Sequence, residues 1–254
     1  MTPSKRRTEI VKIIRQQHRI TVDQLAKTLK ISRETIRRDL TQLANNGKVH
    51  KYHGGASLPM MHGEGPFRTR MGEHVSAKIS MAEQAVQLVS PGETLFMDTG
   101  STTLYFAEKL ADIPGLTVVT NSAEIARILS LSPVHTKTFL LGGEFNGDNR
   151  QTIGSMAISQ IKSFRAHHAF LTVGAIDTRT GVMDFCINEA QIAKAMIEQA
   201  ESLTILVDSS KFDRIASFEV CDLDRVSRVV SETQPTGVLK ESLEDAGVEI
   251  LCEF

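Results

Sequence analysis

The sequence predicts an α/β protein in two domains, a small helical one followed by a larger one built around a mainly parallel sheet. Charge divides the chain: residues 1–55 carry 13 Lys and Arg against 4 Asp and Glu, and residues 56–254 carry 16 against 26. Hydrophobic periodicity divides it in the same region, since three amphipathic helix patterns precede apolar, strand-like runs separated by helical patterns. We expect domains over residues 1–56 and 78–254, joined by a linker over residues 57–77.

Composition limits the classes of function. A basic segment ahead of an acidic one indicates a polyanionic partner for the basic part; a merely solvated charged face does not explain why acidic residues avoid it. Three cysteines, at positions 186, 221 and 252, have no close spacing, so we expect no disulfide framework and no metal site. We also expect no cofactor. The sequence contains no apolar run of about 18 residues and no signal-peptide core, which predicts a cytoplasmic protein without membrane insertion.

The N-terminal domain is expected to contain three helices. Apolar residues at helical spacing predict the first two over about residues 4–17 and 22–29. Thr21 and Gln24 form a capping-box pattern at the start of the second helix. Ser32 is a good N-cap for the third, which follows after a link of two residues. A short helix, a tight link and a cationic helix together predict a helix-turn-helix.

The third helix has the character of a nucleic-acid reader. Ile36, Leu40 and Leu43 recur at positions i, i+4 and i+7 and form one narrow apolar stripe that docks the helix on its neighbours. Outward guanidinium and small polar groups suit the major groove of DNA, although an ordinary amphipathic surface helix has the same pattern. The side chains that point away from the stripe or flank it are Glu34, Thr35, Arg37, Arg38, Thr41 and Gln42.

A short β-ribbon, or wing, is predicted after the third helix. Asn46-Gly47 is a chain-reversal signal, and Gly54-Gly55 ends the extended segment over residues 48–53. On such a ribbon Lys48, Lys51 and His53 can reach phosphates beside the groove. His53 can equally be a capping or packing histidine.

The C-terminal domain alternates predicted strands and helices. Residues 57–73 have little aliphatic periodicity and contain two prolines, so we expect a connector rather than a core element. Helical spacing resumes over residues 78–88. Apolar runs then predict strands over residues 94–97, 116–119, 138–141, 169–173, 203–207, 226–230 and 248–251. Strands separated by helices favour βαβ units and a parallel sheet, which binds ligands at the carboxyl ends of its strands.

The end of the first predicted strand carries the sequence DTGSTTL, followed by a helix expected over residues 105–111. Gly100 permits a sharp turn, while Ser101, Thr102 and Thr103 offer hydroxyls beside the free amides of a helix N-terminus. This arrangement predicts a phosphate site, although such a turn is also found as a simple helix cap. The chain lacks both the Walker and the dinucleotide-binding glycine patterns.

Other predicted strand ends are also polar or rich in glycine. Asn121, the pair Gly142 and Gly143, Gly174 and Asp208 each follow an apolar run. Beyond the last of them, Lys211 can pair with a phosphate or carboxylate or polarise a hydroxyl. Glu189 lies near a helix start, where an acidic residue can bind a ligand or only complement the helix dipole, and Asp98 can be only the cap of its turn.

The motifs resemble those of the DeoR family of bacterial repressors over nearly the whole chain. ISRETIRRDLTQL followed by GKVHKYHGGA resembles its N-terminal winged helix-turn-helix. The resemblance implies that the third helix enters the major groove of double-stranded operator DNA with the side chains Arg33, Thr35, Arg37 and Arg38. Phosphate repels a carboxylate, so Asp39 is expected to fix an arginine or a neighbouring helix instead.

In the second domain DTGSTT, TNS, LGG, VGAI, the glutamate after DF, and DSSKF resemble, in this order, the DeoR-type sensor. That sensor is similar in fold to ribose-5-phosphate isomerases and CoA-transferases, which implies a Rossmann-like α/β domain and a phosphorylated sugar or polyol as effector. The resemblance implies that residues 101–103 hold the phosphate and that Asp98, Glu189 and Lys211 contact hydroxyls or the phosphate. MDFCINE resembles the glycerol-3-phosphate repressor branch, but Cys186 stands where that branch commonly has an acidic residue, so only the class of ligand is implied. The expected effector-binding residues are Asp98, Gly100, Ser101, Thr102, Thr103, Asn121, Gly142, Gly143, Gly174, Glu189, Asp208 and Lys211.

We therefore expect a non-enzymatic repressor of a sugar or polyol catabolic operon that a phosphorylated effector releases from DNA. The alternative is a sugar-phosphate isomerase-like enzyme with Glu189 as base and Lys211 as electrophile, but an isomerase has no need of a cationic helix-turn-helix. A DNA-binding module with a purely structural dimerising body leaves the polar strand ends unexplained. Paired half-sites on DNA predict a homo-oligomer, a dimer or a tetramer.

Overall fold

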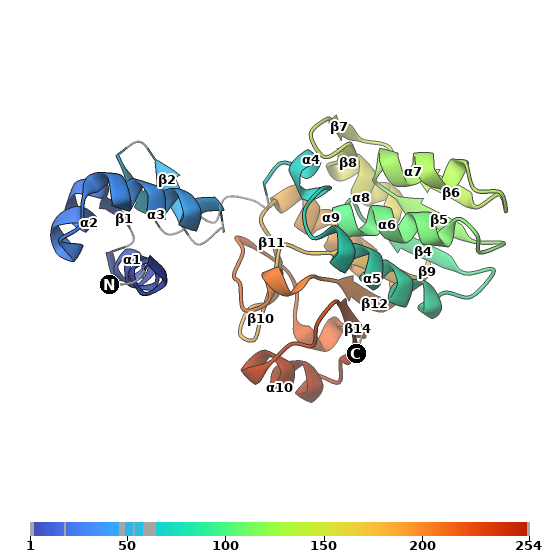
Figure 1. The fold of residues 1–254 in the computed structure, drawn as a ribbon. Coiled ribbons are helices and arrows are strands. Elements are labelled where there is room, and N and C mark those ends of the chain that lie inside the picture. Colours follow the sequence, from blue (N-terminus) through green and yellow to red (C-terminus); the bar gives the residue numbers. More distant parts are fainter. Residues whose placement is uncertain (1–2, 18, 46–48, 53, 58–64, 253–254) are drawn as a thin grey trace. The chain divides into compact units, whose positions relative to one another are not determined.

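The computed structural model describes residues 3–17, 19–45, 49–52, 54–57 and 65–252. The chain divides into two compact units, Met1–His62 and Gly63–Phe254, which we call the head and the body. Figure 1 shows the elements of each unit, and each unit is described here by itself.

The head contains the three expected helices and three short strands. They are α1 (Pro3–Gln17), β1 (Arg19–Thr21), α2 (Val22–Leu29), α3 (Arg33–Asn45), β2 (His50–Tyr52) and β3 (Gly55–Ser57). The capping box at α2 is confirmed, because the Gln24 amide donates to Oγ1 of Thr21 and the Gln24 side chain accepts from the Thr21 amide. Oγ of Ser32 accepts from the Thr35 amide at 3.2 Å, so Ser32 caps α3 as the sequence indicates.

The core of the head is aliphatic and comes from all three helices. Ile10 and Ile14 of α1, Leu25 of α2, and Ile36 and Leu40 of α3 are fully buried in one cluster. The apolar stripe of α3 therefore docks this helix on its neighbours and leaves its opposite face to solvent, as the spacing predicts. Because the apolar stripe packs against α1 and α2, the fold of the head determines which side chains of α3 point outward.

The wing differs from the expected ribbon in its strand order. The sheet has the order β1-β3-β2, so β3 is its central strand and β1, which the sequence did not indicate, is an edge strand. β2 ends at Tyr52, so the extended segment ends at the Gly54-Gly55 pair as expected, but the sequence did not indicate the strand β3 that begins at Gly55. Gly54 has φ 89°, a left-handed conformation that glycine adopts at no steric cost, and it lies between the antiparallel strands β2 and β3. The expected turn at residues 46–47, together with Lys48 and His53, lies outside the described residues.

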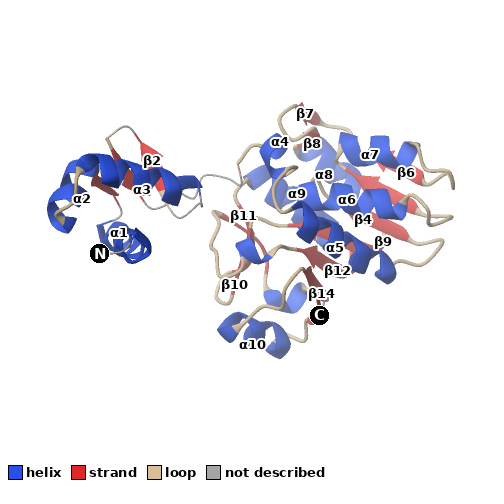
Figure 2. Ribbon diagram, viewed as in Figure 1, coloured by secondary structure: helices blue, strands red, loops and turns tan. Residues whose placement is uncertain are grey.

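A seven-stranded sheet forms the centre of the body, and every neighbouring pair of strands in it is parallel. All seven predicted strands are present with shifts of up to three residues, which confirms the mainly parallel sheet. In spatial order they are β15 (Glu249–Cys252), β14 (Arg228–Ser231), β12 (Ala200–Leu206), β9 (Ala166–Thr172), β4 (Thr94–Met97), β5 (Thr117–Thr120) and β6 (Lys137–Leu140). Figure 2 shows the strands between layers of helices.

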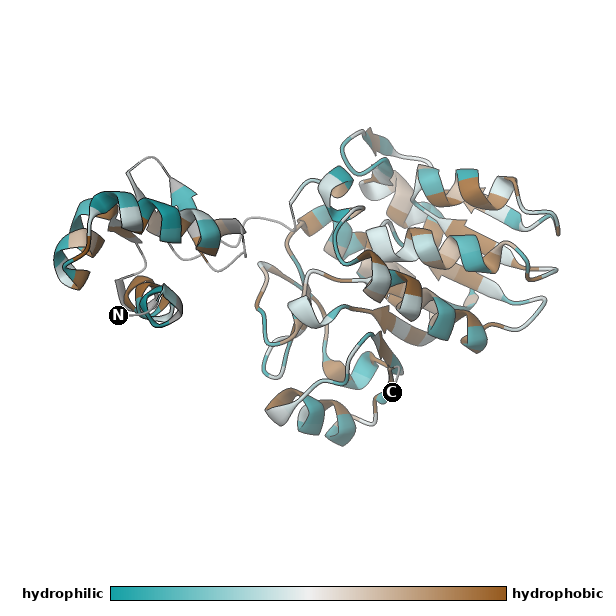
Figure 3. Ribbon diagram, in the orientation of Figure 1, coloured by the Kyte–Doolittle hydropathy of each residue, from teal (hydrophilic) through white to brown (hydrophobic). Residues whose placement is uncertain are grey.

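Helices cover both faces of this sheet. Side chains of β4 alternate between the two layers: Leu95 and Met97 pack in a cluster with α5, α6 and α7, and Phe96 packs in a second cluster with α8, α9 and α10. The bounds are α5 (Val75–Ala85), α6 (Ser101–Leu110), α7 (Ala123–Ser130), α8 (Ser155–Ile161), α9 (Ile187–Glu198) and α10 (Gly237–Asp245). Burial on both faces explains why the strands read as continuous apolar runs, which appear brown in Figure 3.

Smaller elements complete the body. A β7-β8 hairpin and an antiparallel sheet of order β10-β11-β13 are additions to the central sheet. The remaining elements are α4 (Phe67–Arg70), η1 (Val86–Leu88), β7 (Glu144–Asn146), β8 (Gln151–Ile153), β10 (Ala175–Asp177), β11 (Gly181–Asp184), η2 (Ser209–Lys211), β13 (Phe218–Cys221) and η3 (Leu223–Arg225).

The end of the expected connector belongs to the core of the body. Phe67, the first residue of α4, is only 6% exposed and packs in the cluster of α5 and α6. Oη of Tyr105 donates to the Met71 carbonyl at 3.2 Å, which ties the end of α4 to α6. The expectation of a connector without core residues is therefore wrong at this end, because a single buried aromatic side chain carries no periodicity that a sequence pattern can reveal.

Candidate functional site

Asp98 lies directly after β4 and is tied to the end of the neighbouring strand β9. Its carboxylate accepts hydrogen bonds from the backbone N–H of Thr172, at 3.0 and 3.1 Å, and from Oγ1 of the same residue, at 3.2 Å. Burial raises the pKa of Asp98 well above its usual value, the bonds from Thr172 oppose this shift, and the nearby carboxylates of Glu189 and Asp184 add to it. The Asp98 side chain thus ties the end of β4 to the end of β9 and is more than a cap of its own turn.

Gly100 lets the turn after β4 approach β9 closely. A Cβ atom at this position would lie 2.0 Å from Oγ1 and 2.8 Å from Cβ of Thr172. Because no side chain fits in that gap, the turn that carries Asp98 requires glycine here. The sequence identified Gly100 as a turn residue, whereas the structure shows that the close packing of two strand ends demands it.

The helix after this turn begins at Ser101 and not at residue 105, which corrects the expected boundary. Oγ1 of Thr103 donates to the carbonyls of Asp98 and Gly100, both at 3.0 Å, so its hydroxyl holds the turn together. The first bond of the helix runs from the Leu104 amide to the Gly100 carbonyl at 3.3 Å. The amides of residues 101–103 therefore lie in the first turn, where backbone donors have no partner within the helix and can bind an anion.

A chain of buried polar side chains connects the ends of β4 and β5 with α9. Oγ1 of Thr99 donates to Oδ1 of Asn121 at 3.3 Å, and Nδ2 of Asn121 donates to Oε1 of Gln151 at 3.1 Å. Nε2 of Gln151 and Nδ2 of Asn149 each donate to Oε1 of Glu189 at 2.6 Å. The sequence indicated Asn121 and Glu189 but missed the residues between them, because the β7-β8 hairpin brings these in from a segment without any motif.

Asp184 is a further acidic residue of this region that the sequence did not single out. It ends β11, and its Oδ1 accepts from the Cys186 amide at 2.8 Å. Burial raises the pKa of Asp184 to about 7, and the neighbouring carboxylate of Glu189 contributes to the shift. A sequence signal for Asp184 exists, because this acidic residue directly precedes the phenylalanine in the motif MDFCINE.

Three cations of the body have pKa values lowered by burial. Burial lowers the pKa of Arg70, while Glu189, Asp184 and Asp98 act in the opposite direction. Lys78 is 3% exposed and its Nζ donates to the carbonyls of Glu73, at 2.7 Å, and Arg70. Burial also lowers the pKa of Lys211 to about 7, to which Arg214 adds. Of the three, the sequence indicated only Lys211.

A signal for Lys78 existed in the sequence. This lysine occupies a position on α5 that faces the core along with Met81, Ala82 and Ala85. Burying a charged side chain costs free energy unless the charge is paired or hydrogen-bonded. A lysine at a core-facing position of a helix therefore indicates a specific interaction. Asp208 opposes the burial-driven lowering of its pKa, and Oδ1 of Asp208 also accepts from the Ser210 amide at 3.0 Å to cap η2.

The glycines expected near a ligand each have a packing reason in this structure. The Gly142 amide donates to Oε1 of Gln160 at 3.0 Å. A Cβ at Gly143 would lie 2.6 Å from the Ile153 carbonyl oxygen, and one at Gly174 would lie 2.7 Å from the Phe185 ring. These glycines allow close approaches within the protein, and their contact with a ligand stays a prediction.

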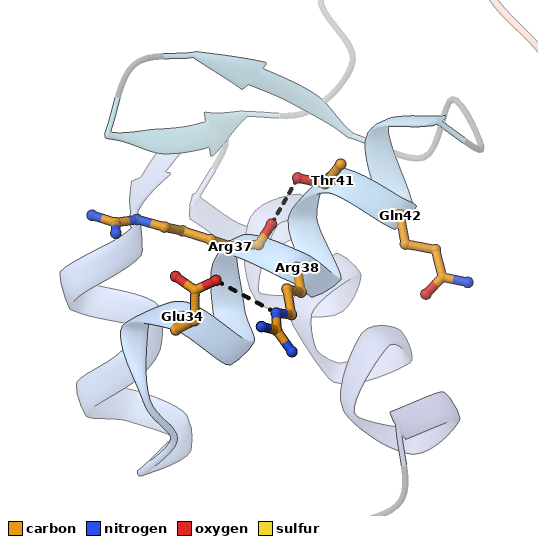
Figure 4. A pocket seen from close by; sticks show the side chains of 5 residues that line it. All are labelled: Glu34, Arg37, Arg38, Thr41 and Gln42. Atoms are coloured by element: carbon orange, nitrogen blue, oxygen red, sulfur yellow. Dashed lines mark hydrogen bonds and ion pairs between the residues drawn. The ribbon is translucent and has the colours of Figure 1, made fainter.

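The outward face of α3 carries the arginines that the sequence indicated. Glu34, Arg37, Arg38, Thr41 and Gln42 line an open hollow on this face, as Figure 4 shows. Nε of Arg38 lies 3.4 Å from Oε1 of Glu34, and the Arg38 side chain is 81% exposed. Arg37 is also exposed, and its carbonyl accepts from Oγ1 of Thr41 at 2.9 Å.

The remaining expected DNA contacts lie in different surroundings. Nζ of Lys51, from β2, donates to Oγ1 of Thr41 at 2.9 Å, which brings the wing to the outward face of α3. Arg33 is exposed and pairs with Asp23 of α2 at 2.7 Å. Thr35 is partly buried, with its hydroxyl 2.8 Å from that of Ser32.

Asp39 has the structural role that the sequence predicts. It is 5% exposed, and Nε and Nη2 of Arg6 donate to its two carboxylate oxygens, the second at 3.1 Å. Nε of Arg7 lies 3.9 Å from Oδ1 of Asp39. The prediction that Asp39 fixes an arginine of a neighbouring helix is confirmed, and this pair joins α1 to α3.

The described residues offer neither a membrane-spanning helix nor a metal-binding cluster. None of the described helices is both long and apolar enough to cross a membrane. Within the same residues, no group of three or more His, Cys, Asp or Glu side chains is arranged to hold a metal ion.

Both units of the chain match known domain families. Residues 6–61 match the DeoR-like helix-turn-helix domain, and residues 73–233 match the DeoR C terminal sensor domain. About half of the chain is similar to part of a ribose 5-phosphate isomerase A from Methanocaldococcus jannaschii, with 19% identity, 55% of each chain covered and a TM-score of 0.40.

Two curated proteins of Escherichia coli (strain K12) are similar over nearly their full length. The HTH-type transcriptional repressor CsqR is 29% identical over 99% of this chain and 96% of its own. The glycerol-3-phosphate regulon repressor is 28% identical over 99% of this chain and 100% of its own. With both domain families matched in their order along the sequence, the chain belongs to the DeoR family of transcriptional regulators.

Proposed function

We propose that this protein represses an operon for the catabolism of a sugar or polyol and leaves its operator when a phosphorylated sugar or polyol binds to the body. The name of the glycerol-3-phosphate regulon repressor supports this class of target. The proposal makes the protein a regulator whose ligand is a signal and is not converted.

The observation that carries the proposal is the outward face of α3. The apolar stripe of this helix is fully buried, so Arg37 and Arg38 are held toward solvent on a rigid support. Arginine can donate two parallel hydrogen bonds to guanine in the major groove, and Lys51 on the wing is close enough to α3 to reach a phosphate beside it. The excess of basic residues in the first 55 residues supplies the attraction to DNA that does not depend on sequence.

The polar strand ends of the body support the effector part of the proposal. The amides at the start of α6, with Lys211, would hold the phosphate, because a helix N-terminus and a lysine both attract an anion. Asp98 and Glu189 would accept hydrogen bonds from effector hydroxyls. Asn121 and Gln151 hold Glu189 in place through the buried chain of hydrogen bonds.

Release follows if the effector binds more tightly to the form of the protein that binds DNA poorly. Such a difference typically corresponds to about 1–3 kcal/mol, or roughly 5- to 150-fold in operator affinity. We further propose a symmetric dimer or tetramer, because a single helix-turn-helix contacts few base pairs and two half-sites one helical turn apart supply the rest.

The experiment measures binding of the full-length protein to the DNA upstream of its own gene by fluorescence anisotropy. Glycerol 3-phosphate, ribose 5-phosphate and other sugar phosphates are added in turn, with glycerol and ribose as unphosphorylated controls. We expect nanomolar binding at low salt and a drop in affinity with one phosphorylated compound. Absence of operator binding, or tight binding of an effector without any change in operator affinity, would contradict the proposal.

The isomerase-like alternative is tested on the same preparation. Glu189 as a base and Lys211 as an electrophile would interconvert aldose and ketose phosphates. Incubation with ribose 5-phosphate, followed by assay for ribulose 5-phosphate, should show no conversion above the spontaneous rate. Conversion that disappears in Glu189→Gln would instead support an enzyme.

A further inference from the structure

Glu34 is an acidic side chain on the outward face of α3, between the arginines that this face carries. It is the second residue of the helix, and its side chain is 64% exposed. The hollow of Figure 4 is lined by Glu34, Arg37, Arg38, Thr41 and Gln42. DNA phosphates repel a carboxylate, so Glu34 lowers the attraction of this face for DNA of any sequence. General attraction to DNA therefore does not explain an acidic side chain at this place.

The stability of α3 does not explain the direction of this side chain either. An acidic residue in the first turn of a helix complements the helix dipole from any side of the turn. The Glu34 side chain points toward Arg38, and Nε of Arg38 lies 3.4 Å from Oε1 of Glu34 (Figure 4). Both side chains are largely exposed, and an exposed ion pair contributes little to stability. The consequence of the pair thus concerns what the face binds.

Glu34 supplies a charged hydrogen-bond acceptor to a hollow that is otherwise rich in donors. The guanidinium groups of Arg37 and Arg38 donate hydrogen bonds and accept none. The hydroxyl of Thr41 is already used twice, because it donates to the Arg37 carbonyl and accepts from Nζ of Lys51, both at 2.9 Å. Among the side chains that line the hollow, the Glu34 carboxylate is therefore the strongest acceptor left for a ligand.

A donor and an acceptor side by side match the edge of a G·C base pair in the major groove. Guanine presents the acceptors O6 and N7 there, which arginine pairs with, and cytosine presents the N4 amino group, which a glutamate accepts from. The 3.4 Å between the ends of Glu34 and Arg38 is about the spacing of neighbouring base pairs along B-DNA. The two side chains are therefore placed to contact the same base pair or two adjacent ones.

We propose that Glu34 is a specificity-determining residue that accepts a hydrogen bond from N4 of a cytosine, at the base pair that Arg38 reads or at its neighbour. On other sequences the carboxylate faces base acceptors and phosphates, which repel it, so it also lowers the affinity for wrong DNA. This inference rests on the proposed function, since it assumes that the outward face of α3 enters the major groove. It adds the identity of a base to be found in each half-site of the operator.

The test selects binding sites from DNA duplexes that contain a randomised segment. The full-length protein is incubated with this library, and sequencing of the bound fraction gives the preferred base at each position. Wild type, Glu34→Gln and Arg38→Ala are compared. Glu9→Gln is the matched control, because it removes the same charge from the head but lies on α1 and does not line the hollow.

We expect Glu34→Gln to change the preferred base at one position of the half-site from cytosine to adenine, because a glutamine amide pairs with N6 and N7 of adenine. In anisotropy measurements its affinity for the site that the wild type selects should fall about tenfold, while its affinity for random DNA should rise. Glu9→Gln should prefer the same bases as the wild type at every position, including this cytosine.

A second variant separates contact with a base from the effect of charge. Glu34→Asp keeps the carboxylate but shortens the side chain by one methylene group. It should discriminate less between cytosine and other bases, while its affinity for random DNA stays within about twofold of the wild type. Because the side chain is exposed, thermal unfolding of both Glu34 variants should match that of the wild type.

The outcomes distinguish this inference from the proposed function. A wild-type protein that enriches no DNA contradicts the proposed function, and the inference falls with it. A wild-type protein that selects a site, together with a Glu34→Gln variant that prefers the same bases, overturns the inference alone, even if the affinity for random DNA changes. Base changes in Glu34→Gln and Arg38→Ala that lie at distant positions of the half-site overturn it as well.

Discussion

Nε2 of Gln151 donates to Oε1 of Glu189 at 2.6 Å, across 38 positions of sequence. The other end of the same side chain, Oε1, accepts from Nδ2 of Asn121 at 3.1 Å. Gln151 is 1% exposed, so both of its polar atoms depend on these partners. One buried amide thus holds a residue at the end of β5 and a residue at the start of α9 in fixed relation.

Replacing this amide by an apolar group of similar shape should destabilise the body. In Gln151→Leu, Glu189 keeps Asn149 as a donor and the Asn121 amide keeps the Thr152 carbonyl, but one N–H of Asn121 loses its acceptor. Leaving a buried polar group unpaired costs about 1–3 kcal/mol. Urea unfolding should show a decrease of this size. Gln160→Leu is the matched control, because its amide makes hydrogen bonds near the surface, and it should change the unfolding free energy by less. Equal effects would contradict the role assigned to Gln151.

Arg38→Ala should reduce the preference for operator over random DNA. An arginine that reads a base pair contributes about 1–3 kcal/mol of discrimination, so operator affinity should fall roughly 5- to 150-fold while affinity for random DNA falls less. The Glu34 partner of Arg38 is exposed, so the loss of this ion pair should change stability little. Footprinting and anisotropy on both kinds of DNA provide the measurement. An unchanged ratio of affinities would remove Arg38 from the reading face.

Lys51→Ala should weaken binding to every DNA sequence by a similar factor. A lysine on the wing that neutralises one phosphate releases about one counterion, so the slope of log K against log salt should become shallower by about one. Binding curves measured from about 50 to about 200 mM salt give this slope for the variant and the wild type. A loss confined to the operator would show instead that Lys51 reads a base.

Effector binding above neutral pH should be accompanied by proton uptake. Burial lowers the pKa of Lys211 to about 7, so at about pH 8 the amine is mostly neutral in the effector-free protein. A bound phosphate favours the charged form and raises this pKa, which draws a proton from the buffer. Calorimetry in buffers of different ionisation enthalpy measures the uptake, and Lys211→Met should abolish it. Binding without proton exchange in the wild type would place the phosphate away from Lys211.

Asp184→Asn should change the dependence of stability on pH. Burial raises the pKa of Asp184 from 3.8 to about 7, so the folded protein retains a proton that the unfolded chain releases between these values. The contribution of this group to stability is therefore present at low pH and is lost as the pH rises toward 7. Relative to the wild type, the variant should gain about 2–3 kcal/mol of unfolding free energy between about pH 5 and pH 7, at about 1.4 kcal/mol per pKa unit. Parallel pH profiles in urea unfolding would contradict this.

Local patterns were enough to predict most of the fold. Thr21 with Gln24 marked the start of α2, and Ser32 marked the start of α3, because the partners of a helix cap lie within three residues of each other. The seven strands of the central sheet were visible because burial on both faces makes such strands continuously apolar. Asp39 could be recognised as structural because a carboxylate on a DNA-facing helix needs a cation partner.

Long-range packing decided the features that the patterns missed. β1 becomes a strand only because β3 lies beside it, and Phe67 is buried only because α5 and α6 provide its cluster. The start of α6 at Ser101 follows from the bonds that Thr103 makes back to the turn. None of these partners can be read from a window of neighbouring residues.

The candidate site divides in the same way. The sequence shows which polar residues, from Asp98 to Lys211, follow the predicted strands. Because parallel strands bring their carboxyl ends to one edge of the sheet, the sequence also predicts that these residues lie at that edge. Which of these groups lie together depends on how distant segments pack, because Glu189 is held by Asn149 and Gln151 from the β7-β8 hairpin. The shifted pKa values have the same origin, because burial and neighbouring charge are properties of the folded surroundings and are absent from the order of residues.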